Sequence, residues 1–246
     1  FDKNNILTKL KSYSLTGINQ KIVDLQVLYV EVDSFIYYNS SQVANVNDLK
    51  SKITTSLTSY ATSSDLNRFG GRFKYSKVLN VIDNIDKSIT SNITRVKIRR
   101  NLNALINQFA QYELCFGNRF NVKPEGLNIK STGFRIQGQS DTVFITDTPN
   151  ADKLTGVISI VKRDETTGTN IVVVKSAGTV DYVHGEVNLT TINIVSTDKP
   201  NNIVEVQAFP DSNDVIGLQD LYLEFNIPNS TINMVKDTIT SGEQIS

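Results

Sequence analysis

Ile and Val are unusually frequent in this chain, and this excess limits the folds that it can adopt. Together they contribute 49 of the 246 residues, against 18 Leu and 7 Ala. Side chains branched at Cβ pack well on pleated sheets, whereas Leu and Ala favour helices. Asn, Ser and Thr contribute a further 71 residues, and Asn and Ser favour turns and helix caps. The composition therefore predicts a chain dominated by strands, with polar surfaces and short loops.

Reactive side chains are scarce. The chain has one Cys, one His, one Met and no Trp. A disulfide needs two Cys, and a zinc cage of Cys and His needs several ligands. We find no phosphate-binding loop, dinucleotide fingerprint or metalloprotease motif. We therefore expect no catalytic residue, cofactor or metal site, and we expect that the protein is not an enzyme.

The charges balance, since 25 Lys and Arg residues face 25 Asp and Glu residues. Nucleic-acid and polybasic membrane proteins need an excess of positive charge, so neither partner is expected. The longest apolar run, residues 171–174, is far too short to span a bilayer. A soluble, intracellular origin is the default expectation. Because the chain begins at Phe1 without Met, we expect a fragment or a processed product.

The first hundred residues predict a small α+β unit. Residues 22–38 are rich in Val, Ile, Tyr and Phe on both faces, which indicates a long central strand. Residues 47–62 and 75–83 have apolar side chains at helical spacing, and Asn45 or Asn47 can cap the first helix. Residues 89–100 alternate as a strand, with Val96 and Ile98 on one face. The two helices are expected to cover one face of the sheet.

The rest of the chain alternates short Val- and Ile-rich runs with turn clusters. Residues 104–116 fit either a helix or a strand, and we favour the strand. Further strands are expected at 134–137, 142–146, 157–163, 171–175, 179–183, 186–189, 192–196, 203–209 and 221–227. Ser230 is expected to cap a short C-terminal helix. The predicted class is thus α+β, with a strand-helix-helix-strand domain at 1–102 and a β-rich, sandwich-like domain at 103–246.

Two single residues have a chemical and a structural interpretation. His184 is the only possible histidine base or ligand, but beside Gly185 it fits a two-residue hairpin turn with positive φ at both positions. Cys115 lies between Leu114 and Phe116, which favours an inert buried thiol over a nucleophile. We favour the structural interpretation for both residues.

Two groups of residues are candidates for a protein interface. Arg95, Lys97 and Arg99 share one face of the predicted strand, and no aromatic residue accompanies them for base stacking. A solvated face or a salt-bridging protein interface is therefore favoured over nucleic-acid binding. The second group is the apolar stripe of the predicted C-terminal helix. This stripe consists of Ile232, Met234, Val235 and Ile239. Docking on a partner and packing on its own domain are equally compatible with this stripe.

Two stretches of the first unit resemble a known family. Residues 69–83 contain a Phe-Gly loop that leads into a short helix, and residues 89–100 read Ile-Thr-Ser-Asn-Ile-Thr-Arg-Val-Lys-Ile-Arg-Arg. Both are similar to the baseplate J-like wedge subunits of T4-like contractile-tailed phages, in their C-terminal portion. Residues 178–187 look like a hairpin of tail proteins of such phages. The resemblance is clearest over residues 20–100, and its motifs are structural.

The resemblance implies a structural subunit of the virion that assembles in the host cytoplasm. Such a subunit forms a homodimer, binds other wedge proteins, builds a ring around the baseplate hub and takes part in triggering contraction. The resemblance offers no active site to carry over. A receptor- or glycan-binding tail module is the alternative, although the lack of Trp weakens it. A hydrolase with paired carboxylates ranks lowest, because no pair among the 25 acidic residues is singled out.

Overall fold

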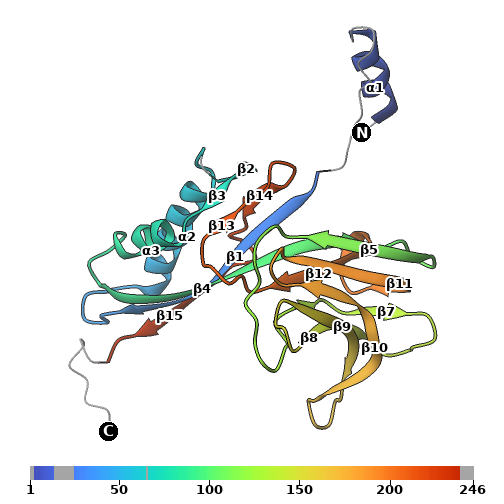
Figure 1. Cartoon of the computed structure of the whole chain (residues 1–246). Helices are drawn as coiled ribbons and strands as arrows, with labels where there is room; N and C mark the ends of the chain where they lie inside the picture. The colour runs from blue at the N-terminus through green and yellow to red at the C-terminus, as the bar shows by residue number, and fades with distance from the viewer. Residues whose placement is uncertain (1–2, 14–24, 65, 239–246) are drawn as a thin grey trace.

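The computed structural model describes residues 3–13, 25–64 and 66–238, with a small helical region beside a larger region of strands (Figure 1). The first part contains α1 (Lys3–Ser12), β1 (Val27–Tyr38), α2 (Val46–Ala61), β2 (Arg68–Phe69), β3 (Arg72–Phe73), α3 (Tyr75–Asp83) and β4 (Ile89–Asn103). The predicted long strand, two helices and second strand are confirmed. The α+β class, rich in strands, is confirmed as well.

The strands β1 and β4 form an antiparallel pair whose even-numbered side chains lie under the helices. Val32 is opposite Val96, and both side chains are at most 2% exposed. Helix α2 contributes buried Leu and Ile side chains to the same core, and its N-terminus is capped by Asn45, which accepts a bond from the Asn47 amide at 3.0 Å. Fully burying such an apolar side chain contributes roughly 1.5–3 kcal/mol. This packing makes one face of the sheet the inner face.

The second part of the chain is almost entirely strands. These are β5 (Phe109–Cys115), β6 (Lys130–Ser131), β7 (Phe134–Ile136), β8 (Val143–Pro149), β9 (Thr155–Arg163), β10 (Asn170–Asp181), β11 (Glu186–Thr197), β12 (Ile203–Ala208), β13 (Val215–Ile216), β14 (Tyr222–Phe225) and β15 (Thr231–Lys236). A short 3-10 helix, η1 (Pro200–Asn202), precedes β12. The preference for a strand over a helix within 104–116 is confirmed by β5. The runs expected at 171–175 and 179–183 form one strand, β10, and those at 186–189 and 192–196 form β11.

One sheet path connects the two parts of the chain. Its order is β2-β14-β1-β4-β12-β6-β8-β7-β11-β10-β9, with β15 beside β1 and β5 beside β11. The strand β4 pairs with β1 in its first part and with β12 near its end, so it passes from the helical region into the β-rich region. The division into domains at 1–102 and 103–246 stays a prediction.

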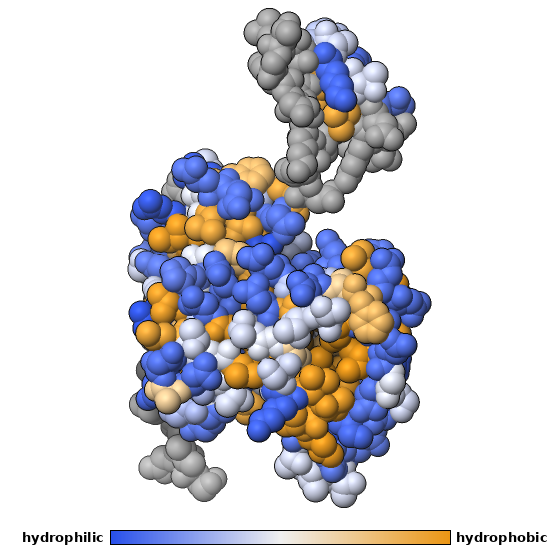
Figure 2. Space-filling view, turned by 45° about the vertical axis from the view of Figure 1, so that its right-hand side comes forward, coloured by the Kyte–Doolittle hydropathy of each residue, from blue (hydrophilic) through white to orange (hydrophobic). Residues whose placement is uncertain are grey.

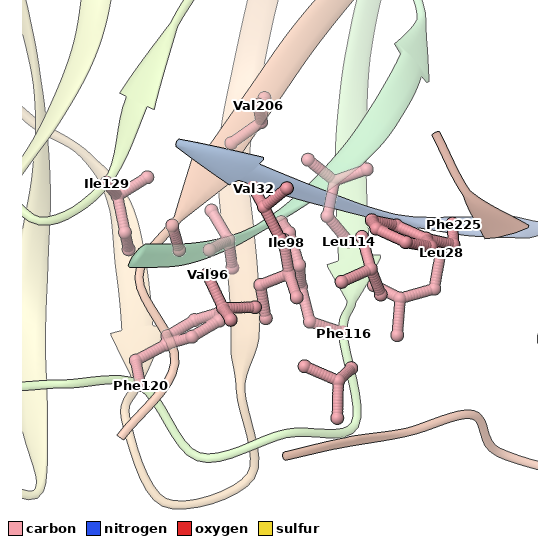
Figure 3. Packing of buried hydrophobic residues seen from close by; sticks show 14 of the residues in the cluster. Leu28, Val32, Val96, Ile98, Leu114, Phe116, Phe120, Ile129, Val206 and Phe225 are labelled. Carbon is pink, nitrogen blue, oxygen red and sulfur yellow. The ribbon is translucent and has the colours of Figure 1, made fainter. Parts of the chain in front are cut away.

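The buried core is also continuous between the two parts. Figure 3 shows Val96 and Ile98 of β4 gathered with Leu114, Phe116 and Phe120, which come from the segment around β5. The rings of Phe116 and Phe120 meet edge to face, with their centroids 5.1 Å apart. The long strand β4 therefore buries side chains against the helices at one end and against aromatic residues at the other.

The predicted C-terminal helix is wrong, because the segment forms the strand β15. It pairs in parallel with β1, so that Ser34 is opposite Ile232 and Tyr37 is opposite Val235. Ser230 does not cap a helix: its hydroxyl accepts a hydrogen bond from the Val32 amide at 3.0 Å. The spacing of Ile232 and Val235 fits a helix, but the free edge of β1 offers the backbone a hydrogen-bonded partner. Ile239 lies outside the described residues.

The predicted two-residue turn at His184 is also wrong. Asp181 is paired with Glu186, so the loop between β10 and β11 has four residues, 182–185. One Asp181 carboxylate oxygen accepts bonds from the amides of Val183 and His184, which holds the loop in shape. Only Gly185 has a positive φ within this loop, at 69°. A Cβ there would lie 2.1 Å from the Asn118 carbonyl oxygen, so the position requires glycine.

Candidate protein-interaction surface

The strands β15, β1 and β4 present a second face on the side away from α2 and α3. Side chains alternate along a strand, so the odd-numbered residues of β1 point away from the helices. The register between the strands fixes which side chains are neighbours on that side. We call this surface the open face; it consists of Asp33, Phe35, Tyr37, Ile93, Arg95, Asn233 and Val235.

An exposed apolar pair lies at the centre of the open face. Phe35 of β1 and Ile93 of β4 are directly opposite each other. Their side chains are 39% and 53% exposed. Tyr37 and Val235, the next pair along β1 and β15, are half-buried. Single exposed apolar residues are common, but a contiguous group with polar neighbours is typical of a protein-binding surface.

Two opposite charges lie next to this apolar pair, both on the same side of it. Asp33 and Arg95 are the next pair of residues along β1 and β4. Asp33 accepts a hydrogen bond from the Asn233 amide group at 3.2 Å. Arg95 is exposed, and it forms no ion pair with any residue in the part of the chain that the structure describes. Its guanidinium is therefore available to a carboxylate of another molecule.

Lys97 and Arg99, the other two predicted interface residues on β4, have partners within the chain. Lys97 lies 3.5 Å from a Glu31 carboxylate oxygen, and Arg99 donates to the other Glu31 oxygen at 2.6 Å. Arg99 also lies 3.3 Å from Glu205 of β12, and its guanidinium is 4.1 Å from the centre of the Tyr29 ring. Arg99 is 5% exposed, and its bonds join three strands of the sheet.

The structure brings together only part of the predicted interface residues. Arg95 on β4 and Val235 on β15 both lie on the open face, on either side of β1. Ile232 and Met234 point to the opposite side, where Ile232 is 6% exposed. As an interface, these residues remain a prediction. Phe35 and Ile93 were not among the predicted residues, although their alternating positions in the two strands were a usable signal.

Another exposed apolar area lies over the β-rich part of the molecule (Figure 2). In β10, Ile171 and Val172 are 41% and 56% exposed. β10 pairs with β11 only from Gly178 to Asp181, so its first half does not pair with that strand. Ile171 and Val172 are consecutive in one strand and point to opposite sides of it, whereas Phe35 and Ile93 lie side by side on one face of the sheet.

The residues with catalytic potential are engaged in local contacts. The Nδ1 atom of His184 lies 2.8 Å from an Asp181 oxygen, and this hydrogen bond raises the pKa of His184. Cys115 is half-buried, and its burial raises the pKa of the thiol, which makes it a poorer nucleophile at neutral pH. Among the described residues, no group of three His, Cys, Asp or Glu side chains is arranged to hold a metal ion.

A recess of about 830 Å³ lies beside β8 and β9. Its walls carry charges of both signs, and Lys162 and Asp141 pair there at 2.8 Å. These charges neutralise each other at the rim, so the recess has no single-sign field for a charged ligand. No helix of the described chain is long and apolar enough to cross a membrane.

Residues 26–101 match the family described as "Baseplate structural protein gp6, C-terminal domain III". The matched segment contains β1, α2, α3 and nearly all of β4, and therefore most of the open face. A comparison with curated proteins finds no match. The family match supports a structural protein of a phage baseplate, located in the virion tail. It is consistent with a protein that is not an enzyme, and it does not favour a receptor- or glycan-binding module.

Proposed function

We propose that the chain is a structural subunit of the baseplate wedge of a contractile-tailed phage. In this role it associates with itself and with other wedge proteins, builds the ring around the baseplate hub and transmits the trigger for contraction. Assembly takes place in the host cytoplasm before the baseplate becomes part of the virion. The resemblance of residues 69–83 and 89–100 to J-like wedge subunits supports this role.

The observation that carries the proposal is the exposed pair of Phe35 and Ile93 beside the charges of Asp33 and Arg95. An assembly protein needs surfaces that exclude water and select a partner, and these residues offer both properties. The buried pair of Arg99 and Glu31 joins β4 to β1 in the supporting sheet and restrains the strands that carry these residues. A rigid surface loses little conformational entropy when it binds.

In this proposal, the two parts of the chain have different roles. Residues 1–102 present most of the open face, while residues 103–246 complete it with β15, extend the sheet and supply further surface. Arg95 and Val235 contact partner proteins directly. Arg99, Lys97 and Ile232 act through the sheet, because they hold the strands that carry those contact residues.

A reconstitution experiment tests this function. The purified chain is mixed with each of the other purified wedge proteins of the same phage, and complexes are measured by size-exclusion chromatography with light scattering. We expect a stable complex with at least one of them. Phe35→Asp is expected to weaken that complex at least tenfold, because the loss of a residue that dominates an interface has an effect of about this size. Phe109→Asp, at a 70% exposed phenylalanine on β5, is the matched control.

Failure of the unaltered chain to bind any wedge protein, together with strictly monomeric behaviour, contradicts the proposed function. Equal binding by the Phe35→Asp variant and the unaltered chain leaves the function intact but rejects the open face as the binding surface. The variant's fold is checked by its circular dichroism spectrum and its thermal unfolding temperature. Phe35 is already 39% exposed, so the substitution is expected to leave both nearly unchanged.

A further inference from the structure

The strands β8 and β9 carry a groove of about 330 Å³ on the face that points away from the core. Ile145 and Ile160 are opposite each other and are buried in the core, so Phe144, Thr146 and Val161 point to the other side. This groove has an apolar middle and a basic residue at each end. We call it the basic groove; it consists of Leu127, Lys130, Phe144, Thr146, Val161 and Arg163.

The pairing of the strands sets the distance between the two basic residues. Lys130 of β6 is paired with Thr146, whereas Arg163 of β9 follows Lys162, the partner of Val143. Lys130 and Arg163 are therefore separated by roughly 13 Å along the strands and about 10 Å across them. Their backbones lie about 16 Å apart, with the apolar middle of the groove between them.

Both basic residues are available to another molecule. Lys130 and Arg163 are exposed, and neither forms an ion pair within the described part of the chain, where no acidic side chain lines the basic groove. Arg163 also borders the larger recess, which contains Asp164. The Asp164 carboxylate, however, accepts bonds from the amides of Thr166 and Thr167 in its own turn, at 2.8 and 2.9 Å.

Two further features of the basic groove indicate an occupant. Thr146 is 7% exposed, and its hydroxyl oxygen has no hydrogen-bond partner among the described residues. Buried hydroxyl groups almost always have a partner, so we expect a group of the occupant to supply one. Leu127 has a φ of 64°, which is unfavourable for leucine, and its side chain is 42% exposed where it lines the groove. Backbone strain of this kind is typical of binding sites.

We propose that the basic groove binds an extended segment of another baseplate protein, with two acidic residues four positions apart and a bulky apolar residue between them. Four positions of an extended segment cover roughly 13 Å, and the long acidic and basic side chains bridge the remaining distance. The apolar residue packs on Phe144 and Val161. The origin of the segment in a baseplate protein rests on the proposed function, whereas the chemistry of the groove does not.

Other ligands fit the basic groove less well. An α-helix with its side chains is about 10–12 Å wide, which is large for a groove of about 330 Å³. A small anion meets only one of the two basic residues, because they lie about 16 Å apart. An extended segment meets both of them and the apolar middle. Since this contact is small, we expect a weak complex, with a dissociation constant on the order of 100 µM.

Fluorescence polarisation with labelled peptides tests the proposal on the full chain. The probe is Glu-Thr-Phe-Thr-Glu, and the control peptides are Lys-Thr-Phe-Thr-Lys and Glu-Thr-Ser-Thr-Glu. We expect the probe to bind about fivefold more tightly than either control peptide. Lys130→Glu and Arg163→Glu are each expected to weaken binding of the probe by about fivefold or more. Lys50→Glu, at an exposed lysine of α2, is the matched control and is expected to bind the probe normally.

Two milder variants separate binding from stability. Thr146→Val removes a hydroxyl without a partner, so the thermal unfolding temperature is expected to stay constant while binding of the probe weakens. Leu127→Gly relieves the positive φ, so the unfolding temperature is expected to rise while binding weakens. A purely structural role of either side chain predicts a lower unfolding temperature and unchanged binding.

Charge reversal gives the sharpest outcome. The double variant Lys130→Glu/Arg163→Glu is expected to prefer the lysine peptide to the probe. Equal binding of the probe by the unaltered chain and both single charge variants overturns the basic groove as its site, and equal binding of all three peptides overturns the proposed ligand. If the probe binds but the chain forms no complex with any wedge protein, the groove stands and the proposed function fails. Complexes with wedge proteins without binding of the probe overturn this inference alone.

Discussion

Arg99 donates a hydrogen bond from Nε to Glu31 at 2.6 Å, and both residues are at most 5% exposed although neither side chain faces the helices. The pair joins β4 to β1, and Glu205 adds a third strand. Removing one partner of a buried ion pair leaves a charge without compensation. Glu31→Gln keeps one acceptor but loses the charge, so we expect the free energy of unfolding to fall by about 2–4 kcal/mol.

Chemical denaturation measures this loss, and Asp141→Asn is the matched control. Asp141 pairs with Lys162 at 2.8 Å, but the two side chains are 51% and 33% exposed. Exposed ion pairs contribute little to stability, so no resolvable change is expected there. Equal effects of the two substitutions would show that the buried pair has no special structural role.

A second buried polar pair is expected to affect stability at high pH. Tyr182 donates its hydroxyl to Asp147 at 2.7 Å, and both side chains are 1% exposed. Tyr182→Phe leaves Asp147 with one donor fewer and is expected to cost about 1–3 kcal/mol. Burial raises the pKa of Tyr182, so the folded protein keeps a proton that the unfolded chain releases above about pH 10.

The sign of this pH effect follows from proton binding. Above about pH 10 the folded state binds more protons at this site than the unfolded state, so the free energy of unfolding falls as pH rises. Below that pH the contribution is fully present. Denaturation between pH 8 and pH 11 is expected to show a shallower decline for Tyr182→Phe than for the unaltered chain. Parallel curves for the two proteins would contradict the assignment.

His184 offers a direct measure of the loop between β10 and β11. Its hydrogen bond to Asp181 raises the pKa of His184 above the ordinary value of about 6.5. As the only His in the chain, it gives a single set of imidazole signals in a proton NMR titration. Asp181→Asn is expected to return the pKa toward its ordinary value. Glu186→Gln is expected to lower it less, because Glu186 acts on the ring only through its charge.

The two sides of β15 are expected to respond differently to truncation. Ile232 is buried on the inner side, so Ile232→Ala is expected to cost about 2–4 kcal/mol of stability. Val235 lies on the open face opposite Tyr37, so Val235→Ala is expected to cost less than about 1 kcal/mol but to weaken self-association. Denaturation and sedimentation of both variants measure the two effects. A helix-like pattern, with both residues equally important for stability, would argue against the strand.

The sequence predicts the helices and long strands of the first hundred residues correctly, because each has its own local pattern of apolar residues. The stripe that includes Leu49, Ile53 and Leu57 specifies α2 without reference to the rest of the chain. β15 was missed because its conformation depends on the edge of β1, nearly 200 residues earlier in the sequence. The spacing of Ile232 and Val235 fits a helix as well as a strand, so only that long-range pairing decides between them.

The interaction surface was predictable only in part for the same reason. Alternation placed Arg95, Lys97 and Arg99 on one side of a strand, which the structure confirms. Whether each is exposed depends on strands that come from elsewhere: Arg99 is covered because Glu31 and Glu205 approach it, whereas Arg95 is not. The pairing of Phe35 with Ile93 required the register between β1 and β4, and alternation within one strand does not contain that register.

The most direct test of this account is whether the open face mediates association. Sedimentation velocity of the unaltered chain, Phe35→Asp and Phe109→Asp, from ~1 to ~300 µM, covers the range of a weak contact. We predict a rise in sedimentation coefficient with concentration for the unaltered chain and for Phe109→Asp, and a constant monomer value for Phe35→Asp. The same rise in Phe35→Asp, or a constant monomer value in all three proteins, would contradict the account.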